Sequence, residues 1–187
     1  MNAAFIIFDQ MTALDFVGFY DPLTRLKSMD FMSDFHWQIC SFCDDVSDNQ
    51  DLRFNADTLK RSLHDFDLLV VPGGYGTRSL QHNHEFIAWL QTAAPVPLKA
   101  SVCTGSLLLG AAGFLKGRRA TTHPKAYGEL SRYCGMVSDQ RVVDDGDVIT
   151  ARGVSSAIDL GLHLVERLAG KEVRIEIARQ MDYPSSP

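Results

Sequence analysis

The sequence predicts an α/β fold: a doubly wound, mostly parallel sheet with helices on both faces. Short apolar runs of strand length, at residues 3–8, 68–71 and 98–102, alternate with segments whose apolar residues are spaced three and four apart. Strands that alternate with helices form parallel sheets whose two faces are both covered. The chain of 187 residues has no internal repeat and no linker-like stretch, so we expect one domain over residues 1–187.

Each element is predicted from a local pattern. Strands are expected at residues 3–8, 36–42, 68–71 and 98–102, and helices at residues 15–27, 58–64, 85–94, 106–115 and 155–169. Pro72-Gly73-Gly74 ends the third strand, and Pro95 ends the helix before the fourth. Asp145-Gly146 lies between Val142-Val143 and Val148-Ile149, which is a strong signal for a β-hairpin.

Composition and charge disfavour several classes of protein. Acidic residues outnumber basic ones by 23 to 18, a net charge of −5, which disfavours a nucleic-acid-binding protein. No apolar run approaches the roughly 18 residues of a membrane-spanning helix, and the first residues lack the basic leader of a signal peptide. Four cysteines are too few for a disulfide scaffold in a chain of this length, so we expect a reduced, cytoplasmic protein.

Cys103 is the residue best placed for chemistry. It lies where the apolar segment 98–102 turns directly into a helix, among the small residues Ser101, Thr104 and Gly105. Such a sharp strand-turn-helix, a nucleophile elbow, lifts the side chain above the sheet, and the free amides at the helix start favour a thiolate over a thiol. The alternative is that Cys103 is a small buried hydrophobic side chain. Composition alone gives the two interpretations equal weight.

A longer stretch around Cys103 resembles a known family. The segment 101–113, together with residues 118–123, is similar to the nucleophile segment of the PfpI-like family, which belongs to the class I glutamine amidotransferase-like superfamily. Within that family the resemblance is to the isonitrile (isocyanide) hydratases. The similarity continues to about Tyr183 through residues 14–18, 71–76, 141–143, 149–150, 153–154 and 157–159. The resemblance implies a flavodoxin-like sheet and a nucleophilic Cys103.

Asp15 is the second residue that the resemblance places in the active site. It follows Leu14 near the start of the first helix, at the edge of the sheet where Cys103 is expected. A carboxyl group that is buried next to a thiolate keeps its proton to higher pH, so it can act as a general acid and then as a base. The alternative is an aspartate that interacts with the free amides of a helix start.

Four further residues complete the predicted site. The resemblance gives Gly73 and Gly74 a part in the oxyanion pocket, where missing side chains let backbone amides approach a ligand; an ordinary tight turn is the alternative. Thr104 stands where protease-like members carry histidine, which disfavours peptidase activity, and the resemblance gives it a contact role. His123 is either the base of a Cys-His pair or part of the pocket wall, and Pro124 replaces the tryptophan that follows this histidine in the hydratase.

Other residues give weaker signals. Arg152 replaces a glycine that is common in relatives, and it either binds an anionic substrate or lies in solvent. Cys40 and Cys43 have the spacing of a redox pair, but they fall in a predicted strand, where residues three apart point to opposite faces. His82 and His84 are more typical of a helix start at the surface than of a metal site.

The resemblance implies a cysteine-dependent hydratase, a lyase that adds water to an isonitrile-like small electrophile and releases an N-substituted formamide. Neither a metal nor an organic cofactor is expected, because a covalent intermediate divides the difficult step in two. The expected partners are a small-molecule substrate and a second copy of the chain in a homodimer, with no nucleic acid and no membrane. The alternatives are glyoxalase/deglycase- or amidase-like chemistry, or a non-catalytic module that senses a ligand or an oxidant. No basic helix-turn-helix segment follows, which disfavours a transcription regulator.

Overall fold

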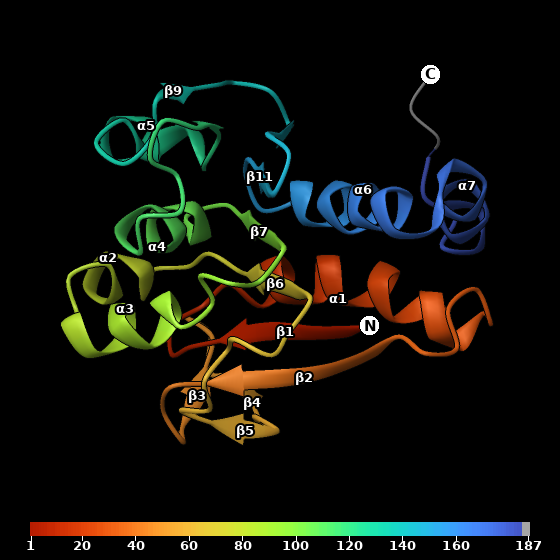
Figure 1. Cartoon of the computed structure of the whole chain (residues 1–187), viewed down its shortest axis with the longest axis horizontal. Helices are drawn as coiled ribbons and strands as arrows, with labels where there is room; N and C mark the ends of the chain where they lie inside the picture. The colour runs from red at the N-terminus through yellow and green to blue at the C-terminus, as the bar shows by residue number, and fades with distance from the viewer. Residues whose placement is uncertain (185–187) are drawn as a thin grey trace.

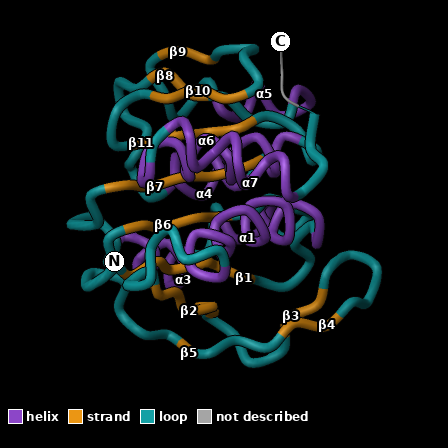
Figure 2. The backbone as a smooth tube through the Cα atoms, turned by 90° about the vertical axis from the view of Figure 1, so that its right-hand side faces the viewer, coloured by secondary structure: helices purple, strands orange, loops and turns teal. Residues whose placement is uncertain are grey.

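The computed structural model describes residues 1–184, and a seven-stranded sheet forms its centre. The strands of this sheet are β1 (Asn2–Ile7), β2 (His36–Ser41), β5 (Thr58–Leu59), β6 (Leu68–Val71), β7 (Leu98–Val102), β10 (Val142–Asp144) and β11 (Val148–Ala151). Their order is β10-β11-β7-β6-β1-β2-β5, which Figure 2 shows from top to bottom. All neighbouring strands are parallel except β10 and β11, which form the predicted hairpin. The mostly parallel sheet is therefore confirmed.

Helices cover the sheet in two groups (Figure 1). The helices are α1 (Ala13–Ser28), α2 (Thr77–Leu80), α3 (His84–Gln91), α4 (Gly105–Ala111), α5 (Tyr127–Leu130), α6 (Ser156–Ala169) and α7 (Lys171–Gln180), with a 3₁₀ turn, η1 (Pro124–Ala126). One group consists of α1, α6 and α7, which pack on one another, and the other of α2, α3 and α4. Two small sheets, β3 (Val46–Ser47) with β4 (Arg53–Phe54) and β8 (Arg119–Ala120) with β9 (Met136–Val137), lie outside the main sheet. This is the doubly wound, flavodoxin-like arrangement that the sequence predicts.

The central strands are buried because helices cover both faces of the sheet. Residues 3–7 of β1 and all four residues of β6 are fully shielded from solvent, which explains why their sequences are continuous apolar runs. On one face, α1 and α6 approach each other closely at two glycines. A Cβ atom at Gly18 would lie 2.5 Å from Ala157 Cβ, and one at Gly161 would lie 2.6 Å from Pro22 Cγ. A side chain at either position would collide with the neighbouring helix, so the close packing of α1 on α6 requires glycine at both. This packing fixes the position of α1, whose first turn contains the start of the predicted site.

The helix predicted at residues 58–64 is wrong. Thr58–Leu59 is the edge strand β5, and its register pairs Thr58 with Cys40 and Leu59 with Ser41. The next residue, Lys60, has a φ of 49°, and its N–H donates to Ser41 O at 2.8 Å. Pairing with an exposed strand edge thus overrides the local composition, which cannot reveal a partner far away in the sequence.

The helix predicted at residues 106–115 is shorter than expected, and α7 was not predicted at all. Helix α4 ends at Ala111, and Gly113 takes a φ of 91°, a left-handed conformation that ends a helix.

Within residues 1–184 no helix is both long and apolar enough to cross a membrane.

Candidate active site

Three turns meet at the carboxyl ends of the neighbouring strands β1, β6 and β7. Asp15 lies in the first turn of α1, Gly73 follows β6, and Cys103 follows β7. A Cβ atom at Gly73 would lie 2.8 Å from both Asp15 Oδ2 and Cys103 Cβ, and 2.5 Å from the Thr104 nitrogen. The carboxyl oxygen and the cysteine Cβ are therefore at most twice 2.8 Å apart. The structure brings Asp15, Gly73, Cys103 and Thr104 together as predicted, at the edge of the sheet where α/β proteins bind ligands.

The backbone at Cys103 has the strained geometry of a nucleophile elbow. Its φ is 55°, in the left-handed region that non-glycine residues seldom occupy. Hydrogen bonds hold the peptide in place: the Cys103 N–H donates to Ala151 O at 3.0 Å, and Cys103 O accepts from the hydroxyls of Thr122 at 2.8 Å and Ser106 at 3.2 Å. Such strain persists only where the surroundings enforce it. The side chain is consequently fixed at the start of α4, with 5 % of the residue exposed.

Asp15 is a fully buried carboxyl group with one oxygen unused. Its Oδ2 accepts the Gly73 N–H at 2.9 Å, whereas Oδ1 has no hydrogen-bond partner among residues 1–184. Burial raises the pKa of Asp15 to about 7, against the opposing effects of the Gly73 amide and of Cys103. The free oxygen can therefore take up or release a proton near neutral pH.

The Cys103 thiol differs from the sequence prediction. The amides at the start of α4 were expected to favour a thiolate, but burial and then the negative charge of Asp15 raise the pKa of Cys103 to about 12. The Thr104 amide acts in the expected direction and lowers this pKa, but it is outweighed. Above pH 7 the pair thus carries one negative charge, which rests on the carboxylate while the sulfur keeps its proton. A thiolate forms when the thiol proton moves to Asp15. The same transfer neutralises the Asp15 carboxylate, whose negative charge had opposed ionisation of the thiol.

Thr104 links the two central turns. Its hydroxyl accepts the Gly74 N–H at 3.0 Å and donates to Gly74 O at 3.1 Å. The amides of Gly73 and Gly74, which were expected to face an oxyanion, are thus already engaged by Asp15 and Thr104. In this structure they position the acid and the threonine, and the backbone N–H next to the sulfur is that of Thr104.

A pocket of about 370 Å³ opens above Cys103. The residues that line it are Thr12, Asn49, Gly74, Tyr75, Arg78, Cys103, Thr104, His123, Lys125 and Val154. Its size suits a small molecule. Asn49, Tyr75, Arg78 and Lys125 were not predicted as site residues, because each lies in a turn or short helix whose position depends on the path of the whole chain.

His123 lines this pocket without a hydrogen bond to Cys103 in the described part of the chain. Its Nδ1 accepts the Lys125 N–H at 3.2 Å, which places the proton of the neutral ring on Nε2. Burial, and then the charges of Lys125, Arg78 and Arg152, lower the pKa of His123. A neutral ring that presents an N–H fits a polar wall of the pocket better than the base of a Cys-His pair.

The remaining candidates lie away from the Cys103 sulfur. Arg152 donates to Asp139 O at 3.1 Å. Cys40 is buried in β2, whereas Cys43 is exposed in a bend beyond the end of this strand at Ser41, so the predicted strand does not include both residues. All four cysteines are free thiols. Asn83 accepts the Glu85 and Phe86 amides and so begins α3, which accounts for the neighbouring histidines as a helix start. No cluster of three potential metal ligands occurs in residues 1–184.

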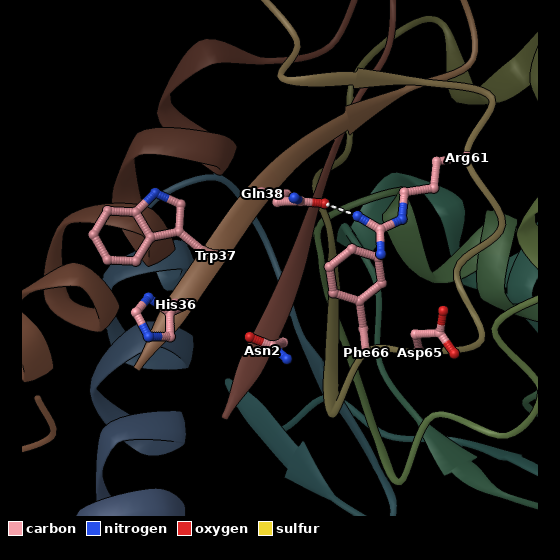
Figure 3. Close-up of a pocket in the computed structure, with 7 residues that line it drawn as sticks. All are labelled: Asn2, His36, Trp37, Gln38, Arg61, Asp65 and Phe66. Carbon is pink, nitrogen blue, oxygen red and sulfur yellow. Dashed lines mark hydrogen bonds between the residues drawn. The ribbon is translucent and has the colours of Figure 1, made fainter. Parts of the chain in front are cut away.

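A second cavity of about 390 Å³ lies at the opposite edge of the sheet, near the amino ends of β1 and β2 (Figure 3). It is lined by Asn2, His36, Trp37, Gln38, Arg61, Asp65 and Phe66. Arg61 donates to Gln38 Oε1 at 2.7 Å and lies over the Phe66 ring, so its polar and apolar surfaces are both in contact. Among residues 1–184, no cysteine or serine lines this cavity.

Comparisons with known proteins identify the family of the chain. The profile of the DJ-1/PfpI family matches residues 1–167. The chain belongs to this family. It is 33 % identical over 189 residues to the isonitrile hydratase of Pseudomonas putida, an alignment that covers all of this chain and 80 % of that protein. It is also 32 % identical over 125 residues to protein DJ-1alpha of Drosophila melanogaster, covering 66 % of this chain and 58 % of the relative.

Solved structures show the same fold. A THiJ/PfpI family protein from Pseudomonas syringae superposes with a TM-score of 0.88 at 28 % identity, covering all of this chain and 76 % of that one. Drosophila melanogaster DJ-1beta superposes with a TM-score of 0.84 at 25 % identity, covering 98 % of each chain. The family therefore includes relatives named for an enzymatic activity and relatives that are not.

Proposed function

We propose that this member of the DJ-1/PfpI family is a cysteine-dependent hydratase that converts a small isonitrile into an N-substituted formamide. The observation that carries the proposal is the Asp15–Cys103 pair: a buried carboxyl with a free oxygen next to a nucleophile at an elbow. Full-length similarity to an isonitrile hydratase supports the choice of substrate class. The pocket that Cys103 lines has a volume of about 370 Å³, which supports a small-molecule substrate.

The first half of the reaction forms a covalent adduct. The Asp15 carboxylate takes the thiol proton, and the Cys103 sulfur attacks the terminal carbon of the isonitrile. Asp15 then gives this proton to the same carbon, which yields a thioimidate in which carbon is bonded to sulfur, to hydrogen and, by a double bond, to nitrogen. One proton thus moves from sulfur to carboxyl to carbon, and the net charge of the site does not change.

The second half consumes water. The oxygen of a water molecule adds to the thioimidate carbon while one of its protons reaches the nitrogen. Asp15 accepts the remaining hydroxyl proton as the carbon–oxygen double bond forms and the carbon–sulfur bond breaks. The products are the formamide, a Cys103 thiolate and a protonated Asp15, and transfer of the proton back to sulfur restores the resting pair.

The direct test is turnover of an alkyl isonitrile by the purified protein. We expect formamide to accumulate, measured by mass spectrometry, and an adduct of isonitrile mass to appear on the peptide that contains Cys103. A protein whose thiol titrates as intact but that converts none of several alkyl and aryl isonitriles would contradict the substrate assignment. In that case a parallel screen of methylglyoxal and small amides would show whether the pair serves glyoxalase/deglycase- or amidase-like chemistry instead.

We also propose that the protein is a homodimer. Two large apolar side chains at the start of α1, Leu14 and Val17, are 48 % and 46 % exposed, an arrangement typical of a surface that another protein covers. We expect sedimentation equilibrium to give twice the chain mass, and Val17→Glu to shift the protein towards monomer. Leu52→Glu is the matched control, because Leu52 is 55 % exposed but lies outside α1. A wild-type monomer at micromolar concentration would contradict the proposal.

A further inference from the structure

The charge of the active-site pocket differs in sign from the charge of the protein. The chain carries a net charge of −5, yet the residues that line the pocket include two cations and no acidic side chain. The cations are Arg78, in α2, and Lys125, in η1. Two short elements from distant parts of the sequence thus bring positive charge to the pocket that Cys103 lines. A pocket with one sign of charge raises the local concentration of ligands of the opposite sign.

The two cations differ in how far nearby acids neutralise them. The Arg78 Nε lies 3.3 Å from Glu129 Oε1, and its NH1 donates to Thr77 Oγ1 at 3.2 Å, so one side of the guanidinium is occupied. Lys125 forms no ion pair with a carboxylate in residues 1–184. Asp15, the acid that interacts with Cys103, is fully buried and is not among the residues that line the pocket. Of the two cations that line the pocket, Lys125 is therefore the one that no carboxylate of residues 1–184 neutralises by direct pairing.

His123 points to the same conclusion. It lines the same pocket as Cys103 and the two cations, and the charges of Lys125, Arg78 and Arg152 all act on its ring. Since its Nδ1 accepts from the Lys125 amide, the ring presents Nε2–H as a further donor. Two cations and a neutral N–H donor in one pocket are the kinds of group that bind a carboxylate in proteins.

We propose that the pocket above Cys103 takes a small substrate that carries a carboxylate, which Lys125 and Arg78 hold while the reactive carbon faces the sulfur. The inference builds on the proposed function, because it names the class of electrophile that the same site receives. A volume of about 370 Å³ leaves room for a carboxylate and a short carbon chain. Neutral isonitriles remain substrates, but they lack the group that the cations orient.

Alkylation of Cys103 tests this charge preference without any turnover. Iodoacetate and iodoacetamide are similar in size and both lose iodide as the sulfur–carbon bond forms, but only iodoacetate carries a carboxylate. The rates at Cys103 are measured by mass spectrometry of its peptide in a Cys43→Ser background, because Cys43 is an exposed thiol that would consume reagent. We expect the iodoacetate-to-iodoacetamide rate ratio to exceed that of 2-mercaptoethanol in the same buffer by about tenfold, and to fall as salt is added.

Variants with equal changes of net charge assign the effect to the pocket. Arg78→Gln with Lys125→Gln should return the ratio to that of 2-mercaptoethanol. The control pair, Lys116→Gln with Arg132→Gln, removes one lysine and one arginine that are exposed and outside the pocket, and it should leave the ratio unchanged. All four positions are at the surface, and thermal unfolding checks that the folds are intact. A ratio that is equal in the wild type and in the pocket variant would overturn the inference.

A matched pair of substrates separates this inference from the proposed function. Isocyanoacetate should show a kcat/KM about tenfold above that of its methyl ester, and the pocket variant should lose this difference mainly through KM. Equal turnover of acid and ester, with an unchanged alkylation ratio, would support the hydratase and overturn the carboxylate preference. If neither compound is turned over but the alkylation ratio still depends on Arg78 and Lys125, the proposed hydratase activity is refuted. The preference of the pocket for a carboxylate is then supported, for a different reaction.

Discussion

Cys103→Ser should lower the turnover of an alkyl isonitrile by about a thousandfold or more, because a serine hydroxyl is a far weaker nucleophile at neutral pH. The substitution changes one atom, so the elbow and its backbone hydrogen bonds to Ala151, Thr122 and Ser106 are expected to remain. The readouts are formamide production and the mass of the peptide adduct. Both should vanish together, since the adduct is the proposed intermediate.

The matched control for this experiment is Cys43→Ser. Cys43 is an exposed free thiol outside the pocket, so its loss should leave turnover within about twofold of the wild type. Full activity in Cys103→Ser would show that the sulfur does not react. Equal loss of activity in both variants would show that the loss is not specific to Cys103, and it would contradict a single nucleophile.

Asp15→Asn should have the second largest effect on turnover and should alter the pH profile. In the wild type the carboxylate that removes the thiol proton forms as the pH rises through about 7, so kcat/KM should rise over the same range and then level off. Asparagine can neither take this proton nor return it to carbon. We expect a loss of about a hundredfold to ten-thousandfold at pH 8, with residual activity that rises only as the thiol itself ionises at much higher pH. A variant with the wild-type pH profile would exclude the proposed role.

The same substitution should stabilise the fold at alkaline pH. Since burial raises the pKa of Asp15 from 3.8 to about 7, the folded state binds the proton more tightly than the unfolded state. The free energy of unfolding therefore falls as the pH rises through this interval, by up to about 4 kcal/mol. Asp15→Asn removes this cost, so it should unfold at higher denaturant concentration than the wild type at pH 8. The difference should disappear below about pH 4.

Asp144→Asn provides the control of opposite sign. Burial tends to raise the pKa of Asp144, but the bonds from Arg167 and His163 outweigh it and hold this pKa below its ordinary value. This carboxylate stabilises the fold at neutral pH, and its contribution is lost as the pH falls through its folded pKa. Denaturant titrations between pH 4 and 8 should thus show Asp15→Asn gaining and Asp144→Asn losing stability at the alkaline end. Curves that move together would contradict the assigned environments.

The fold was predictable where local sequence and burial agree. The cores of β1, β6 and β7 are apolar runs because both faces are covered, and the signals at Pro72 and at Asp145-Gly146 mark turns that the structure contains. Residues 58–64 failed because the edge of β2 decides their conformation. Sequence patterns indicate which residues of a segment can be buried. They do not indicate which unpaired strand edge the segment will pair with.

The site was predictable in part for the same reason. Cys103 and Asp15 follow strand ends, and the parallel sheet itself brings such ends together. The raised pKa of Asp15 was predicted, but that of Cys103 was not, because the effect of burial on the thiol outweighs that of the Thr104 amide only in the folded site. Arg78 and Lys125 were missed because nothing in their surrounding sequence indicates that η1 and α2 face one pocket.

The raised pKa of Cys103 makes its thiol a weaker acid in the native protein than in the denatured chain, where it has the ordinary value of 9.0. Small oxidants and alkylating reagents that need only an ionised sulfur should thus attack the denatured protein faster. In the proposed mechanism, the folded protein keeps this sulfur protonated towards such reagents, and it becomes nucleophilic only when the residue 15 carboxylate accepts its proton.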